Sequence, residues 1–307
     1  MSAEAGRPRV ICLLGPTAVG KTALAVALGE RLGGEVVSAD SRQIYRGVSI
    51  GSGAPSPEEL ARVPHHLVGF CDPRTAYSVA EFKAAAESAL ADIVARGRAP
   101  LLVAGTGMWL KALTAGWTLT QVPADPELRA RLAGEPAAAL HARLAQADPA
   151  TAARLAPADH KRVVRALEVL TLTGQPLSSH LAQAGSTPVA FDYQLWGLRR
   201  ARESLCARIE ARVDAMLAAG WLDEVRALLA AGLTGGEPAL EALGYRHLVA
   251  ALRGALAFDE AVARTKQDTR RFAKRQMTWF RALPDVSWLD LDELGVEAAA
   301  DRLVSRD

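Results

Sequence analysis

The chain has 307 residues, of which 50% are hydrophobic and 23% are charged. This composition indicates an ordinary globular protein that is long enough to bury a sizeable core. The formal net charge of only +2 excludes attraction of nucleic acid by bulk charge, so any nucleic-acid surface must come from local clusters of Lys and Arg.

The cysteines and the N-terminal residues bear on the cellular compartment. Cys12, Cys71 and Cys206 are widely separated and have no spacing that suits a zinc site or a disulfide framework. Residues 1–9 contain no apolar stretch of an export signal, and later apolar runs are far too short to span a bilayer. We therefore expect a cytoplasmic protein with no membrane partner.

The first third of the chain alternates short apolar runs with helical patterns. We predict strands at residues 10–14, 35–39 and 100–104, and helices at 21–32 and 79–95. This rhythm is typical of an α/β fold with a parallel sheet and helices on both of its faces.

From about residue 123 the pattern is helical, and no strand is indicated until residues 189–198. We predict an all-helical insertion domain at residues 121–188, which divides a core made of residues 1–120 and 189–307. The later core is expected to contain helices near 202–217, 222–231 and 258–281 and a short strand at 286–289.

A phosphate-binding motif lies between the first predicted strand and the first predicted helix. It satisfies G-x-x-x-x-G-K-[ST] with Gly15, Pro16, Thr17, Ala18, Val19, Gly20, Lys21 and Thr22. Its glycines let backbone N–H groups converge on phosphate oxygens, and the helix N-terminus adds positive potential. We predict a P-loop that binds phosphate or pyrophosphate, in which Lys21 neutralises charge and the Thr22 hydroxyl holds Mg²⁺.

The residues after the neighbouring strands indicate what the P-loop does. The strand at 100–104 is followed by Gly105 and Thr106 with no carboxylate, which weakens the case for nucleotide hydrolysis. Asp40 follows the strand at 35–39, near the sheet edge where such folds bind ligands, and is a candidate proton acceptor. Taken alone, an Asp at this position is more often the cap of a turn or helix.

In order and spacing, the motifs resemble the tRNA dimethylallyltransferase (tRNA isopentenyltransferase) family over nearly the whole chain. The matching segments are residues 15–22, 40–47, 50–51, 64–67, 72–73, 77–78, 105–113, 165–169, 243–245 and 269–281. Beyond the P-loop each segment is weak evidence, but their joint order is highly specific. The resemblance implies a P-loop prenyltransferase that moves a dimethylallyl group from dimethylallyl diphosphate to the exocyclic amine of the adenosine 3′ of the anticodon, releasing pyrophosphate.

The resemblance also implies roles for single residues. Asp40 is the expected general base, Thr17 and Thr106 lie near the reacting centre, and Arg212 lies near the pyrophosphate. The tRNA contacts that it implies are Asp40, Ser41, Arg42, Gln43, Thr106, Arg129, Gly244, Tyr245 and Arg246. The anticodon stem-loop is the expected RNA partner, and we expect a monomer.

Two basic clusters are candidates for contact with the RNA backbone. One contains Lys161, Arg162 and Arg165 on a predicted helix. The other lies on the helix at 258–281, includes Arg271, Lys274 and Arg275, and is opposed on that helix only by Asp268. Phe272, Trp279 and Phe280 interleave with it, and we expect them to pack in the core rather than stack on bases.

The chain departs from the family pattern at two places. Ser52-Gly53-Ala54 stands where Thr-Ala-Lys is common, which removes a lysine, and Trp109 stands where Tyr is common. His65 and His66 have no metal-ligand companions and are expected to be structural. Three alternatives stay open: a small-molecule or nucleotide kinase, an enzyme that prenylates free AMP, and a non-catalytic RNA-binding protein.

Overall fold

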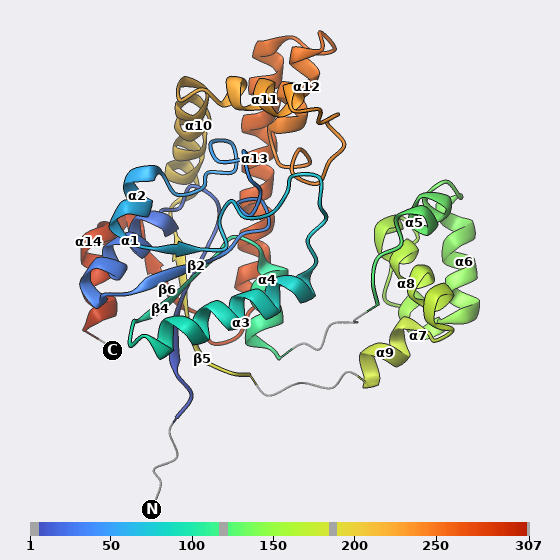
Figure 1. Ribbon diagram of the computed structural model, residues 1–307, viewed down its shortest axis with the longest axis horizontal. Coiled ribbons are helices and arrows are strands. Elements are labelled where there is room, and N and C mark those ends of the chain that lie inside the picture. The colour runs from blue at the N-terminus through green and yellow to red at the C-terminus, as the bar shows by residue number, and fades with distance from the viewer. Residues whose placement is uncertain (1–5, 117–121, 184–188, 306–307) are drawn as a thin grey trace, which may run out of the picture. The chain divides into compact units, whose positions relative to one another are not determined.

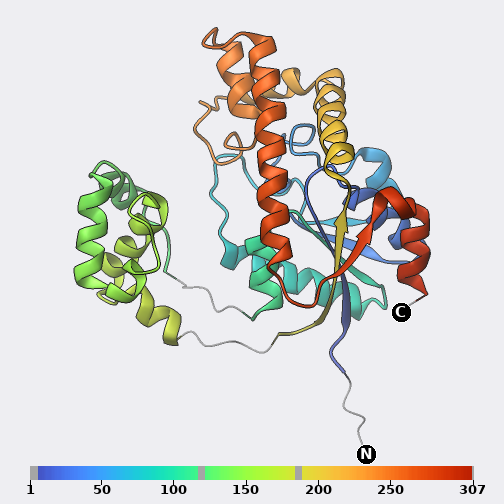
Figure 2. The ribbon, with the colours of Figure 1, turned by 180° about the vertical axis from the view of Figure 1, so that it is seen from behind.

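The structure is a computed structural model that describes residues 6–116, 122–183 and 189–305 (Figures 1 and 2). The chain divides into two compact units, one of Met1–Leu113 with Val189–Asp307 and one of Thr114–Pro188. The boundaries that the sequence predicts at residues 120–121 and 188 lie outside the described residues.

The first unit contains a six-stranded parallel sheet, as the sequence predicts, in the order β3-β2-β4-β1-β5-β6. The strands are β1 (Arg9–Leu14), β2 (Glu35–Ala39), β3 (His65–His66), β4 (Pro100–Ala104), β5 (Asp192–Arg199) and β6 (Ser287–Asp290). Leu14 pairs with Ala104, which pairs in turn with Ala39. The segments that follow β1, β4 and β2 therefore leave the sheet side by side at one edge.

Alternate residues of β1, which lies between β4 and β5, face two apolar layers, as expected for a parallel sheet buried on both faces. Ile11 and Leu13 pack with helices α1 (Lys21–Leu32) and α14 (Leu291–Val304). Val10, Cys12 and Leu14 belong to the cluster on the other face. Helices α3 (Val79–Ala95), α4 (Gly107–Thr114) and the C-terminal part of α13 (Phe258–Arg281) contribute to this second cluster.

The remaining helices of the first unit extend beyond the carboxyl edge of the strands (Figure 1). They are α10 (Arg202–Ala218), α11 (Trp221–Ala230) and α12 (Tyr245–Leu252), whereas α2 (Pro57–Arg62) packs beside α1. Together with α13 they surround the segments that leave the sheet there, which places a group of side chains from distant parts of the sequence around one end of the fold.

The second unit consists of short helices, and the described residues within it form no strand. The helices are α5 (Pro126–Ala133), α6 (Ala137–Ala147), α7 (Pro149–Ala152), α8 (His160–Thr173) and α9 (Leu177–Gln183). Leucines such as Leu132, Leu140 and Leu167 form an apolar core of its own. Separate cores of this kind are the mark of separate domains.

Candidate active site

The P-loop has the backbone geometry that its glycines make possible. Gly20 has φ 116° and Gly15 has φ 152°, and a Cβ on Gly15 would lie 2.7 Å from the carbonyl oxygen of Leu198. Lys21 Nζ donates to the carbonyl oxygens of Gly15 (2.8 Å) and Pro16 (3.0 Å), so the ammonium lies along the loop. The first N–H groups of α1 have no partner within the helix and are therefore available to an anion.

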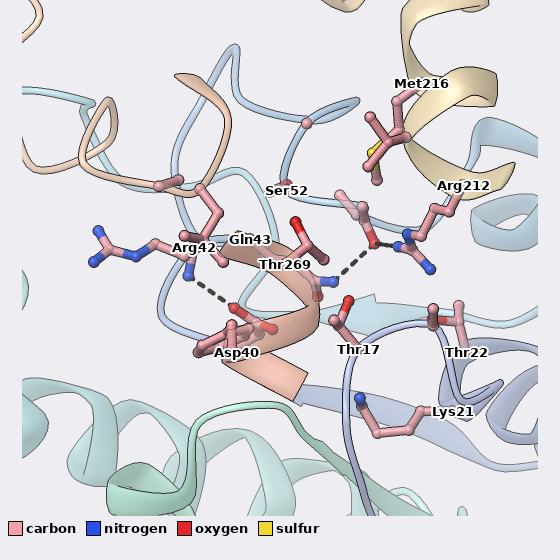
Figure 3. Close-up of a pocket in the computed structure, with 18 of the residues that line it drawn as sticks. Thr17, Lys21, Thr22, Asp40, Arg42, Gln43, Ser52, Arg212, Met216 and Thr269 are labelled. Atoms are coloured by element: carbon pink, nitrogen blue, oxygen red, sulfur yellow. Dashed lines mark hydrogen bonds between the residues drawn. The ribbon is translucent and has the colours of Figure 1, made fainter. Parts of the chain in front are cut away.

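A cavity of about 450 Å³ lies in the first unit beside the P-loop (Figure 3). Its walls come from the P-loop, the turn after β2, the loop at residues 51–54, and helices α10 and α13. Many of the predicted site residues line it: Thr17, Ala18, Gly20, Lys21, Thr22, Asp40, Arg42, Gln43, Arg212 and Arg275. The fold thus gathers the donor and acceptor groups that the sequence indicates around one cavity.

Asp40 lies at the end of β2, and its two carboxylate oxygens have different surroundings. Oδ1 accepts the N–H of Arg42 at 2.9 Å (Figure 3). Oδ2 lies against Gly105, on which a Cβ would come within 2.3 Å of that oxygen. Thr106 Oγ1 accepts the N–H of Ser41 at 3.0 Å and donates to Ser41 Oγ at 3.2 Å, so the turns after β2 and β4 brace each other.

Arg212 and Gln43 meet at the loop where the chain departs from the family pattern. Arg212 Nη2 (3.2 Å) and Gln43 Nε2 (2.9 Å) both donate to the carbonyl oxygen of Gly53 (Figure 3). Gln43 Oε1 accepts the hydroxyl of Ser38 at 2.8 Å, which fixes the orientation of its amide. A Cβ on Gly53 would come within 1.8 Å of Arg212 Nη2, so the glycine lets the guanidinium approach the loop.

The charges around the cavity are mainly positive. Burial lowers the pKa of Lys21 to about 8, although the Asp40 carboxylate raises it, and Arg212 lowers it further. Burial also lowers the pKa of Arg212 below its usual range, while Asp40 acts in the opposite direction. Arg208, which sequence reasoning missed, lines the cavity and donates from Nε to the carbonyl oxygen of Ala18 at 2.9 Å. Cations that converge on one cavity stabilise an anionic ligand such as pyrophosphate.

Several other lining residues were not predicted. Gln276 hydrogen-bonds to both the P-loop and the turn after β4. Phe272 was expected to pack in the core but lines the cavity, with the guanidinium carbon of Arg275 5.8 Å from its ring centroid. Trp279 and Phe280 do pack in the core, as expected. The helical period separates these aromatics, but without the fold it does not reveal which side of α13 faces the cavity.

Gly244 and Tyr245, two predicted tRNA contacts at the start of α12, are packed inside the first unit. Tyr245 is fully buried, and its hydroxyl donates to Glu224 Oε1 at 2.6 Å. The sequence predicts Tyr245 as a tRNA contact, and the packing of α12 on α11 removes its side chain from the surface. Gly244, with φ 86°, lies against the ring of Trp221, where a Cβ would come within 2.1 Å of that side chain.

The basic side chains of α13 differ in their partners. The sequence indicates Asp268 as their only opposing carboxylate, which is wrong, since Glu260 and the α10 residues Glu210 and Asp214 also pair with this helix. Arg271 and the neighbouring Arg246 both pair with Asp268. Lys274 and Arg275 have no ion pair to any carboxylate in the described parts of the chain.

In the second unit, Arg129 and Arg165 converge on Glu168, whose side chain is 0% exposed. Burial raises the pKa of Glu168, but hydrogen bonds from these two arginines outweigh this effect and lower it below the usual value. Lys161 and Arg162 lie on α8 with exposed side chains, and Arg162 pairs with Asp159 at 2.9 Å. Two of the predicted RNA-contacting arginines of this unit therefore also stabilise its interior.

The residues present fit a magnesium ion only if the ligand supplies most of the coordination. Among the described residues, no group of three or more His, Cys, Asp or Glu side chains could hold a metal ion. Thr22 lines the cavity at the start of α1 and offers a hydroxyl. Mg²⁺ is commonly bound by few protein groups together with phosphate oxygens and water.

The fold and the site define the class of the protein, which is an α/β protein whose P-loop binds a phosphorylated ligand at the carboxyl edge of a parallel sheet. Residues 43–283 match the IPP transferase family, and residues 8–68 match the isopentenyl transferase family. The chain belongs to the IPP transferase family.

Two relatives, both named tRNA dimethylallyltransferase, align with nearly all of the chain. The tRNA dimethylallyltransferase of Symbiobacterium thermophilum is 52% identical over 286 residues, covering 92% of this chain and 89% of the relative. The tRNA dimethylallyltransferase of a Roseiflexus species is 46% identical over 299 residues, covering 96% of this chain and 97% of the relative.

Solved structures of similar enzymes match the fold of this chain. The tRNA isopentenylpyrophosphate transferase of Bacillus halodurans matches with a TM-score of 0.71 and 36% identity, covering 98% of this chain and 97% of that one. A eukaryotic dimethylallyltransferase acting on tRNA matches with a TM-score of 0.82 and 26% identity, covering 97% of this chain and 80% of that one. Within the described residues, no helix combines the length and apolarity that crossing a membrane requires.

Proposed function

We propose that this protein transfers the dimethylallyl group of dimethylallyl diphosphate to the N6 amine of the adenosine 3′ of the anticodon in tRNA. The C–O bond of the donor breaks, pyrophosphate leaves with the bonding electrons, a C–N bond forms, and the amine loses a proton. The observation that supports this reaction best is that Asp40 and the P-loop line one cavity, in a chain whose relatives are tRNA dimethylallyltransferases.

The donor half of the reaction requires stabilisation of a growing negative charge. Lys21, Arg212 and the N-terminus of α1 surround the expected pyrophosphate position with positive potential. Thr22 would hold Mg²⁺, which would neutralise charge on the pyrophosphate oxygens. Because the backbone of the P-loop is preorganised, these groups need little rearrangement as the C–O bond breaks.

The acceptor half requires a base, because the lone pair of an adenine amine is delocalised and its nucleophilicity is low. Asp40 accepts the proton, and the amide of Arg42 holds Oδ1 so that the carboxylate keeps one orientation. Thr17 lies close to the reacting atoms, and Thr106 braces Ser41 beside the base. The target adenine must leave the anticodon-loop stack to enter the cavity.

The tRNA surface is proposed on both units. On the first unit it includes Ser41, Arg42, Gln43, Arg246, Arg271, Lys274 and Arg275, and on the second Arg129, Lys161, Arg162 and Arg165. We propose that the enzyme acts as a monomer. We propose a cytoplasmic location, which the tRNA dimethylallyltransferase relatives support.

Incubation of the purified protein with radiolabelled dimethylallyl diphosphate, ATP and unmodified tRNA tests the proposal. We expect label in tRNA, none in free AMP supplied instead of tRNA, and no loss of the ATP γ-phosphate. Transfer of that phosphate to a small acceptor would show that the protein is a kinase. Label in AMP would show that free AMP is the acceptor instead of tRNA. Inorganic pyrophosphate should compete with the donor better than ATP does.

A further inference from the structure

A glutamine on α13 joins the P-loop to the turn after β4, and this turn lies against the Asp40 carboxylate. Gln276 Oε1 accepts the N–H of Thr17 at 2.9 Å, and Gln276 Nε2 donates to the carbonyl oxygen of Gly105 at 2.7 Å. The residue is only 7% exposed, so neither bond competes freely with water. Both ends of one side-chain amide are therefore used, one in the P-loop and one in the turn after β4.

Each bond fixes an element that matters to the reaction. The N–H of Thr17 is directed to Gln276, so it is not part of the phosphate cradle, and the hydrogen bond orients the residue whose side chain lines the cavity. The turn after β4 is held from its other side as well, because Gly105 N (3.2 Å) and Thr106 N (3.1 Å) donate to the carbonyl oxygen of Ala39. Gly105 in turn lies against Oδ2 of Asp40.

The same turn of α13 also presents exposed basic residues. Successive residues of a helix point about 100° apart, so Gln276 faces the two loops while Lys274 and Arg275 have exposed side chains. Ala273 is 2% exposed and packs with Ala18 of the P-loop and Ile209 of α10, so this part of α13 is in direct contact with the P-loop. A displacement of α13 is thus transmitted to the P-loop through both packing and hydrogen bonds.

We propose that Gln276 is a positioning residue that fixes the P-loop and the Gly105 turn to α13, so that Thr17 and Asp40 keep one geometry when tRNA binds the helix. This inference rests on the proposed function. Gln276 does not touch the reacting atoms in this assignment. A misplacement of about 1 Å at a reacting centre costs a factor of roughly 10² in rate, which sets the size of the expected effect.

The chemistry of the two bonds gives a specific test, because the side chain must accept at one end and donate at the other. In Gln276→Glu, an ionised carboxylate still accepts the N–H of Thr17 but repels the carbonyl oxygen of Gly105. The protonated carboxyl restores the donor. In Gln276→Met, a side chain of similar length makes neither bond at any pH.

The experiment measures single-turnover transfer to tRNA at saturating donor, from about pH 6 to about pH 9, with each variant divided by wild type at the same pH. We expect Gln276→Glu to lose roughly 10² in rate at high pH and to recover as the pH falls and the new carboxyl is protonated, because burial raises the pKa of a carboxyl above its usual value. Gln276→Met should show a loss that does not depend on pH. The affinity for inorganic pyrophosphate should change little in Gln276→Met, because this variant adds no charge beside the P-loop.

The outcomes separate this inference from the proposed function. Rates of Gln276→Glu within about twofold of wild type across the whole range would overturn the positioning role. A loss without any recovery at low pH would also overturn it, because the restored donor is the core of the assignment. If wild type itself transfers no label to tRNA, the proposed function fails instead. A thermal midpoint for each variant guards against unfolding, and Gln276→Glu alone suffices if Gln276→Met does not fold.

Discussion

At the scale of single residues, the proposed function assigns Asp40 to the acceptor and Lys21 to the leaving group, and both residues line the same cavity. Asp40→Asn keeps the shape of the side chain and its bond from the Arg42 amide but removes the proton acceptor. We expect turnover to fall by roughly 10² to 10⁴ with little change in tRNA affinity. Asp223→Asn is the control, because its exposed carboxylate lies on the outside of α11. Near wild-type turnover of Asp40→Asn at saturating substrates would eliminate the base assignment.

The lowered pKa of Lys21 predicts a pH limit on donor binding. Since this pKa is about 8 in the free protein, the ammonium is present below that pH and is lost above it. We expect kcat/KM for the donor to fall as the pH rises through about 8, while kcat falls only at higher pH because bound pyrophosphate raises the pKa of Lys21. Lys21→Met should weaken donor binding and remove this fall of kcat/KM at high pH. If kcat/KM of the variant still falls in the same pH range, the titration belongs to another group.

The same pKa predicts the sign of a stability change. The folded-state pKa of Lys21 is below the unfolded value, so between pH 8 and the usual range of lysine the unfolded chain binds more protons. The free energy of unfolding should therefore rise with pH in this window because of Lys21. In Lys21→Met this contribution should disappear, and the midpoint of chemical denaturation below pH 8 should not fall below that of wild type.

Gly105 tests the geometry of the base without changing its chemistry. A Cβ at this position would lie 2.3 Å from Asp40 Oδ2, so Gly105→Ala must push the carboxylate aside. We expect a loss of turnover approaching that of Asp40→Asn, with pyrophosphate affinity retained. Gly236→Ala is the matched control, since a Cβ there meets nothing within 4 Å. Full activity of Gly105→Ala would mean that the carboxylate tolerates displacement and that its position is not critical.

At the scale of elements, the basic side chains of α13 can be divided by their partners. Neutralising Lys274 and Arg275 together should weaken tRNA binding and lower its log–log salt slope by roughly one to two units, because fewer counterions are released. Neutralising Lys266 and Arg270, which pair with Asp214 and Glu210, is the control and should change the slope less. A normally folded Lys274/Arg275 variant with an unchanged slope would move the RNA surface to Lys161 and Arg162.

The elements also show where sequence reasoning succeeds and where it fails. Helices α1, α3 and α13 begin and end at the predicted residues, because glycines, a capping Ser78 and apolar periodicity all agree there. Strands β5 and β6 are shifted by one to three residues from the predicted ranges. Strand β3 has only two residues, too few for a pattern, and α4 begins at Gly107 inside a segment that reads as a turn.

The site was predicted best where chemistry and local spacing coincide. The P-loop and Asp40 are local signals at strand ends, and the fold places both on the cavity. Gln276 gives no local signal, because a glutamine on a helix is usually solvated and its partners lie 259 and 171 residues away. The burial of Tyr245 likewise depends on how α12 packs on α11, which no spacing encodes.

At the scale of the whole molecule, Glu168 predicts that the two units respond differently to mutation. Glu168→Ala removes the acceptor of Arg129, Arg165 and the N–H of Asp125, and because the two arginines are partly exposed to water we expect a loss of about 1 to 3 kcal/mol. Hydrogen exchange should speed up in α5 and α8, while pyrophosphate binding by the first unit stays unchanged. Glu135→Ala, at a half-exposed pair with Arg143, should have little effect. Equal destabilisation of both units would show that they unfold together.

The order of the strands has a consequence for the synthesis of the protein. The central strand β1 is flanked by β4 and β5, and β5 follows the whole helical insertion in the sequence. Thr17 and Gln276 are 259 residues apart. At about 5 to 20 residues per second, roughly 13 to 50 seconds pass on the ribosome between these two residues. The P-loop of the nascent chain is therefore made long before the helix that packs on it. A chain that terminates before α13 also lacks β6, which leaves β5 as an unpaired edge strand and the active site incomplete.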